Sequence, residues 1–134
     1  MPPRKPQARA EMALRDYAMT YPQATEDFPW DHRAIKVKGK MFLILSGPEG
    51  ILNVTVKLPE SGPHALGLPF TEPTGYGLGK SGWVTASFWA KDTVPLEMIR
   101  EWIDESYRAV APRRLVAALE GASKSEQKPK RKKK

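Results

Sequence analysis

Apolar positions near the start of the chain recur three and four residues apart. The recurring positions are Ala10, Ala13, Leu14, Tyr17, Ala18 and Tyr21. This spacing places them on one face of an α-helix, and Pro22 ends the pattern because proline cannot continue a helix. We therefore predict an amphipathic helix of about three turns over residues 10–21.

Alternation of apolar and polar residues then indicates three consecutive β-strands. In residues 34–46, Ile35 and Val37 alternate with lysines before a Lys38-Gly39 pair. That pair suits a tight hairpin turn, because glycine accepts positive φ. The predicted inward positions of the second and third strands are Met41, Leu43, Leu45, Leu52, Val54, Val56 and Leu58. Three such strands in a row predict an antiparallel meander.

The remaining segments predict a long loop, one more strand and a second main helix. Residues 59–82 hold most of the interior Gly and Pro, so we expect a loop there, with one helical turn at most. Residues 83–89, WVTASFW, alternate as a strand does, and Asp92 or Thr93 can cap the helix that follows. The predicted buried stripe of that helix is Leu96, Ile99, Ile103, Tyr107 and Val110. Pro112 ends it, and a short helical piece is expected over residues 113–121.

Length and composition predict one domain with loose ends. The chain has 134 residues, 13 of them proline, and no cysteine, which excludes disulfides and thiolate chemistry. The apolar run at residues 41–45 is too short to span a bilayer. We expect a disordered arm over residues 1–9, a domain over 10–121 and a disordered basic tail over 122–134. We expect a bacterial, cytoplasmic monomer with no membrane contact.

The net charge of +7 resides in the two ends of the chain. Residues 124–134 carry seven Lys/Arg and one Glu, giving +6, and Arg4, Lys5 and Arg9 add +3. Subtracting both from the total leaves about −2 for residues 10–123. The predicted domain is therefore not basic as a whole, whereas its tail would bind polyanions by counterion release whatever the fold does.

A glycine-rich stretch invites a nucleotide-binding hypothesis. Gly77, Gly79 and Gly82 form a literal G-x-G-x-x-G with Lys80-Ser81 inside it. A dinucleotide fingerprint needs a strand before the glycines and a helix after them, because the helix N-terminus holds the pyrophosphate. Here a Pro-bearing loop precedes the glycines and a strand follows. A phosphate loop would also need glycine where the chain has Thr74. Both nucleotide hypotheses are rejected.

Four stretches in order resemble the MmcQ/YjbR family: TEDFPW, KVKGKMF, GYGLGKSGWVT and IDESYRAV. The resemblance runs from about residue 10 to 119. It implies a frataxin/CyaY-like α+β fold, an antiparallel sheet with N- and C-terminal helices packed on one face. It also implies DNA binding, since members are described as "double wing" DNA-binding proteins. The Pro/Gly-rich segment after Lys57 departs from relatives that carry a clear helix there.

The uncovered sheet face supplies the candidate nucleic-acid contacts. Lysines neutralise phosphates and exposed aromatics stack on unpaired bases. The candidate residues are Lys36, Lys38, Lys40, Lys57, Lys80 and Trp83, with Lys130, Arg131 and Lys132 in the tail. The same pattern also suits an open sheet whose lysines and threonines are solvated and whose tryptophans cover its edges. No recognition helix is evident, so sequence-specific groove reading is not supported.

Metal and acid–base chemistry have few candidates. They are His32, His64, Glu26, Asp27 and Asp31, and two histidines in separate loops are a weak basis for a site that needs three or four convergent ligands. Asp104 and Glu105 are adjacent on a helix and point apart, so they are not an acid–base pair. Frataxin-like proteins bind iron on an acidic first helix, but Glu11 and Asp16 alternate here with arginines. We expect no metal, no cofactor and no catalytic residues.

The sequence thus predicts a non-enzymatic domain that binds DNA weakly and without sequence preference, through sheet-face lysines, tryptophan and the basic tail. A second hypothesis is a protein-interaction module that uses the same surface on a protein partner. A third is a small-molecule pocket beneath the loop 59–82, if that loop is ordered over a cavity.

Overall fold

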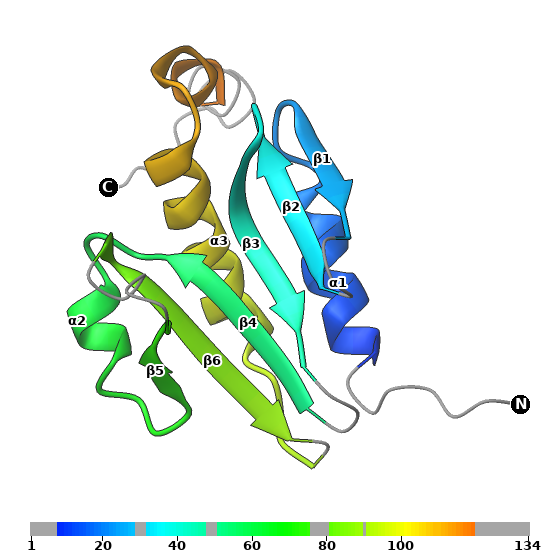
Figure 1. The fold of residues 1–134 in the computed structure, drawn as a ribbon, viewed down its shortest axis with the longest axis vertical. Coiled ribbons are helices and arrows are strands. Elements are labelled where there is room, and N and C mark those ends of the chain that lie inside the picture. The colour runs from blue at the N-terminus through cyan, green and yellow to red at the C-terminus, as the bar shows by residue number, and fades with distance from the viewer. Residues whose placement is uncertain (1–7, 29–31, 48–50, 76–80, 90, 120–134) are drawn as a thin grey trace, which may run out of the picture.

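The computed structural model describes residues 8–28, 32–47, 51–75, 81–89 and 91–119, and they form one sheet covered on one face by two helices (Figure 1). Six antiparallel strands lie in the order β1-β2-β3-β4-β6-β5. Helices α1 (Ala8–Ala18) and α3 (Leu96–Val110) pack behind them and contact each other. The predicted α+β fold is confirmed. Helix α1 includes Ala8 and Arg9, which we had expected in a disordered arm.

The meander is formed by β2 (Arg33–Val37), β3 (Lys40–Ser46) and β4 (Ile51–Lys57). The turn between β2 and β3 has positive φ at both central residues, Lys38 at 52° and Gly39 at 82°. Two left-handed residues match the right-handed twist of the flanking strands, which is why the hairpin closes in two residues. The next neighbour, β6 (Trp83–Trp89), pairs with β4 along its full length.

Two short edge strands were not predicted, whereas the one helical turn allowed in the loop 59–82 is present. Strand β1 (Ala24–Asp27) lies between the first predicted helix and the first predicted strand, where no element was predicted. Strand β5 (Thr71–Pro73) and helix α2 (Gly62–Ala65) lie in the expected loop. The edge strands are polar and only half covered, so they carry little alternation, and their order comes from pairing with β2 and β6. The expected cap of α3 is also wrong, because Pro95 occupies that position without a side-chain bond.

The core lies between the sheet and the two helices. Phe42, Tyr21 and Tyr107 form an aromatic cluster, with ring centroids 5.1 Å apart for Phe42–Tyr107 and 4.7 Å for Tyr21–Tyr107. Trp102 of helix α3 is also buried in the core. Other members of the core are Leu14, Ala18, Ile35, Val37, Leu43, Leu45, Leu52, Val54, Val56, Leu58, Val84, Ala86, Phe88, Ile99 and Ile103.

A β-bulge in β3 corrects one core prediction. The register pairs Ile35 with Leu43 but Lys36 with Met41, so Phe42 is an extra residue. A bulge lets two successive side chains point to the same side. Phe42 and Leu43 are therefore both fully buried, whereas Met41, which we had expected inward, is 38% exposed.

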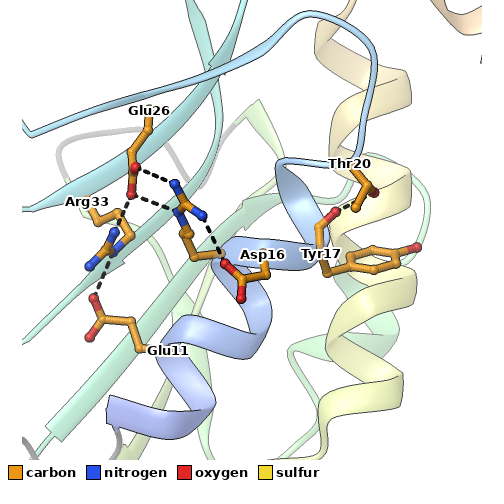
Figure 2. Close-up of polar contacts among 7 residues, drawn as sticks. Glu11, Asp16, Tyr17, Thr20, Glu26 and Arg33 are labelled. Atoms are coloured by element: carbon orange, nitrogen blue, oxygen red, sulfur yellow. Dashed lines mark hydrogen bonds and ion pairs between the residues drawn. The ribbon is translucent and has the colours of Figure 1, made fainter.

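Charged side chains tie α1 to the strands β1 and β2 (Figure 2). The Glu26 carboxylate accepts two hydrogen bonds from Arg15, at 3.2 and 2.9 Å, and one from Arg33. Arg33 also donates to Glu11 at 3.0 Å, and Arg15 to Asp16 at 2.9 Å. The hydrogen bonds from Arg15 and then Arg33 hold the pKa of Glu26 below its ordinary value, although burial opposes them.

This network should make stability depend on acid pH. A carboxyl group whose pKa is lowered by folding contributes stability above its unfolded pKa of 4.5, and that contribution is lost as pH falls through the folded value. We expect Glu26→Gln to lower the free energy of unfolding by about 2 kcal/mol at pH 6, a value typical of a hydrogen bond to a charged group. Near pH 3 the loss should be smaller. Urea unfolding at a series of pH values measures both.

The Glu72→Gln substitution on β5 is the matched control, because Glu72 is exposed in the edge strand. It should follow the pH profile of the unsubstituted protein. A Glu26→Gln variant whose deficit is the same at pH 3 and pH 6 would show that the network's charge does not contribute, and that only its packing does.

Candidate functional site

The helix-free face of the sheet carries a ladder of hydroxyl and amide groups. Thr55 and Thr85 are hydrogen-bonded across β4 and β6 at 3.0 Å, and Ser87 donates to Asn53 at 2.6 Å. Thr74 reaches Thr85 at 2.9 Å. These hydrogen bonds link neighbouring polar side chains across the centre of the face.

Strands β3 and β4 separate at one end of the sheet. Their pairing runs from Ser46↔Asn53 to Ile44↔Thr55, and the same register, continued by two residues, would place Phe42 opposite Lys57. Instead the hydroxyl of Ser106, from α3, lies between these two residues. It accepts a hydrogen bond from the Lys57 amide at 2.9 Å and donates to the Phe42 carbonyl at 2.6 Å. A buried hydroxyl thus replaces the missing backbone bond.

A hollow of about 350 Å³ lies where the strands have separated. Its described lining comes from the β2–β3 turn, the start of β3, the ends of β4 and α3, and the start of β6: Gly39, Lys40, Met41, Lys57, Trp83, Ala109 and Val110. Lys57 and Trp83 are direct cross-strand partners, which fixes their side chains next to each other. Lys40 is exposed at the start of β3. Two cations and one indole therefore converge from distant parts of the chain.

The predicted contact residues divide into three groups. Lys40, Lys57 and Trp83 meet at this hollow, and Lys38 is exposed in the adjoining turn. Lys36 does not belong with them, because its ammonium donates to Asp27 at 3.0 Å. That bond, together with the Phe28 amide, lowers the pKa of Asp27. Lys80, Lys130, Arg131 and Lys132, like both predicted terminal segments apart from residues 8 and 9, lie outside the described residues.

Two exposed arginines that we had not singled out extend the basic character of this end. Arg113 and Arg114 begin the helical segment 113–119, and Val110, three residues before Arg113, lines the hollow. Consecutive Cα atoms are 3.8 Å apart, so Arg113 starts within about 11 Å of Val110. The sequence signal was available: an Arg-Arg pair directly after a helix-breaking proline.

Two other hollows differ in charge. One of about 550 Å³ borders β5 and the far end of β6, and its lining includes Glu72, Asp92 and Trp89. The other, of about 420 Å³, lies between α2 and the start of β6, and its described lining has no charged side chain. Trp83 lines this hollow as well as the hollow between the separated strands. The latter is called the lysine-lined hollow below, because Lys40 and Lys57 are among its lining residues.

Other chemistry finds little support in the described part of the chain. Among those residues no group of three or more His, Asp or Glu side chains is placed to hold a metal ion. Asp104 accepts hydrogen bonds from Tyr21 and Arg108, while Glu105 accepts from the backbone of Glu60 and Ser61. The two carboxylates thus serve separate structural contacts. After the glycine-rich stretch the chain enters β6, as predicted, and not the helix that a dinucleotide site requires. No described helix is long and apolar enough to cross a membrane.

Comparison with known proteins agrees with this architecture. The crystal structure of the Deinococcus radiodurans protein DR2400, with domain family DUF419, superposes with a TM-score of 0.60 and 28% sequence identity. The match covers 74% of this chain and 76% of that one. No curated protein matches the chain. The YjbR family model matches residues 19–109, more than half of the sequence. The chain therefore belongs to the YjbR family.

Proposed function

We propose that this protein binds the phosphate backbone of DNA, weakly and without sequence preference, at the end of the sheet where Lys40, Lys57 and Trp83 meet. The observation that supports the proposal most directly is the lysine-lined hollow, whose described lining has two cations and no carboxylate. Lysine ammonium groups neutralise phosphates and release condensed counterions, which provides affinity for any sequence. Arg113 and Arg114 add two exposed positive charges after helix α3. Residues 124–134, which lie outside the described part of the chain, add a net charge of +6 by sequence.

The acidic character of helix α3 supports the proposal that binding has no sequence preference. A helix that reads bases must enter the major groove with polar and basic side chains. Helix α3 instead carries Glu97, Glu101, Asp104 and Glu105 and buries its apolar side against the sheet. Phosphates would repel these carboxylates. Contacts to the backbone alone position a protein on DNA without specifying a sequence.

We expect the double substitution Lys40→Ala/Lys57→Ala to weaken binding to a labelled duplex and to reduce its salt dependence. Two lost phosphate contacts should reduce the magnitude of the slope of log K against log salt by about 1.8 for a duplex. Fluorescence anisotropy over a salt series measures this slope. The same titrations with a chain that ends at Gly121 separate the tail's contribution from that of the domain.

The control is Lys91→Ala, the loss of an exposed lysine that does not line the hollow. Lys91 is exposed beyond the far end of β6, at the opposite end of that strand from Trp83. Its loss should reduce binding far less than the double substitution does. Binding that disappears with the tail and is unaffected by Lys40→Ala/Lys57→Ala would refute a DNA site on the domain.

A second function, capture of a protein partner, is favoured by one observation. The uncharged hollow between α2 and β6 is lined by Leu58, Pro59, Pro63 and Leu66, with Trp83 on its border. Leu66 is 39% exposed. Apolar surface of this kind binds proteins through contacts that salt does not weaken, whereas phosphate binding falls steeply as salt rises. The salt series therefore distinguishes the two functions.

A further inference from the structure

The lysine-lined hollow has the character of a stacking site more than of a flat phosphate-binding surface. Of its described lining, only Lys40 and Lys57 are charged, and the rest is backbone, aliphatic side chain, thioether and indole. Met41 is exposed here because the bulge at Phe42 turns it away from the core. The walls are thus apolar and the cations stand among them, which is the combination that single-stranded nucleic-acid sites use.

Trp83 is held firmly enough to act as a stacking platform. It is the first residue of β6 and pairs directly with Lys57 on β4. Its side chain is half-buried, and it borders a hollow on each of two sides. A platform anchored by strand pairing loses little conformational freedom when a ligand binds, so more of the stacking free energy remains as affinity.

Shape decides between duplex and single strand. A duplex has a convex, charged exterior, and the faces of its bases are covered by their neighbours, so it cannot fill a concave hollow with an aromatic ring. An unpaired base exposes its π-face and can enter. We propose that the hollow receives an unpaired base of a single-stranded nucleic acid, which stacks on Trp83 while Lys40 and Lys57 contact the flanking phosphates. This inference rests on the proposed function and names its substrate class.

The other tryptophan of β6 provides an internal comparison. Trp89 lies on the same face of the strand, six residues on, at about 20 Å along an extended chain. It is the more exposed of the two, at 58%. The hollow beside it, however, is lined by Glu72 and Asp92, whose carboxylates repel phosphate. Exposure alone would favour Trp89, whereas the combination of aromatic ring and cations favours Trp83.

The test compares a labelled ten-nucleotide oligo(dT) with a ten-base-pair duplex, using the full chain, so that the tail contributes to both. Trp83→Leu should weaken oligo(dT) binding about 10-fold, within the range measured for one stacked base, and duplex binding less than about 2-fold. Trp83→Phe keeps an aromatic ring and should retain most of the single-strand affinity. Trp89→Leu is the matched control and should leave both affinities unchanged. Circular dichroism melts verify that each variant folds.

A measurement on the unsubstituted protein guards against variants that fail to fold. Oligo(dT) should shift the NMR signal of the Trp83 indole N–H, and the duplex should not. Equal effects of Trp83→Leu on both probes, or an unshifted indole signal when oligo(dT) is bound, would overturn the single-strand inference and leave the proposed DNA binding in place. Failure to bind either probe would overturn both.

Discussion

Replacing Ser106 by alanine should lower the free energy of unfolding by about 2 to 6 kcal/mol. The Ser106 hydroxyl is fully buried and bonds two backbone groups, the Lys57 amide and the Phe42 carbonyl. Alanine lacks this hydroxyl, so both backbone groups would lose their hydrogen-bond partner at once. A buried backbone group without a partner costs about 1 to 3 kcal/mol, and two are left here. Urea unfolding of the two proteins under the same conditions measures the difference.

The same chemical change on the open sheet face is the control. Ser87 donates its hydroxyl to Asn53 on the helix-free face, where water can replace it. Ser87→Ala should therefore cost less than about 1 kcal/mol. If Ser106→Ala costs no more than the control, the strands β3 and β4 must be able to close and pair directly. Stronger protection of the Lys57 amide from hydrogen exchange in the variant would show that closure.

The Ser106 contact also bears on the candidate site. Lys57, which lines the hollow, is one of the two residues that the hydroxyl bridges, and Met41, which also lines it, adjoins the other, Phe42. The separation of β3 and β4 is therefore built in by a residue of α3 and is not a fraying end. A Ser106→Ala variant that remains folded should show a changed affinity for oligo(dT), because closure of the strands would narrow the hollow.

Gly47→Ala should lower the free energy of unfolding by about 3 kcal/mol, through steric overlap and backbone strain together. Gly47 follows β3 with a φ of 126°, a conformation that side chains rarely adopt. A Cβ atom there would lie 2.6 Å from the carbonyl oxygen of Ile51. That oxygen belongs to the backbone of β4 and cannot rotate away as a flexible side chain would. Thermal and urea unfolding measure the loss.

Gly39→Ala separates strain from overlap. Gly39 also has a positive φ, 82°, but a Cβ atom there would meet nothing within 4 Å. Alanine at that position should cost only the strain of a left-handed residue, about 1 kcal/mol. Similar losses for the two substitutions would mean that the chain after β3 moves to relieve the contact with Ile51, which would contradict the steric argument.

Regular patterns made most of the fold predictable. The β2–β3 hairpin follows from alternation around Lys38-Gly39, and α3 follows from a stripe that includes Ile99, Ile103 and Tyr107. Each pattern is local and repeats at the period of its element, so it can be recognised without knowing which other elements pack against it. The edge strands β1 and β5 escaped prediction because they are short and polar and form only against a partner strand.

The candidate site was only partly predictable. Residue type pointed to lysines and Trp83 on strand ends, but nothing local distinguishes Lys36, which is paired with Asp27, from Lys57, which lines the hollow. Met41 was expected in the core because strict alternation places it there. The bulge that exposes it depends on Phe42 filling the space beside Tyr107 and Tyr21. The position of the bulge is therefore set by tertiary packing and cannot be recognised from the alternation of apolar and polar residues.

The sequence by itself determined the class of fold, the hairpin and the two helix stripes, because those depend on spacing along the chain. It also placed the basic charge at the chain ends and excluded thiol chemistry. Only the tertiary structure decided that Lys40, Lys57 and Trp83 share one hollow, and that Ser106 bridges two strands beside it. These residues are far apart in sequence, and their meeting depends on sheet order and helix packing, which no local pattern encodes.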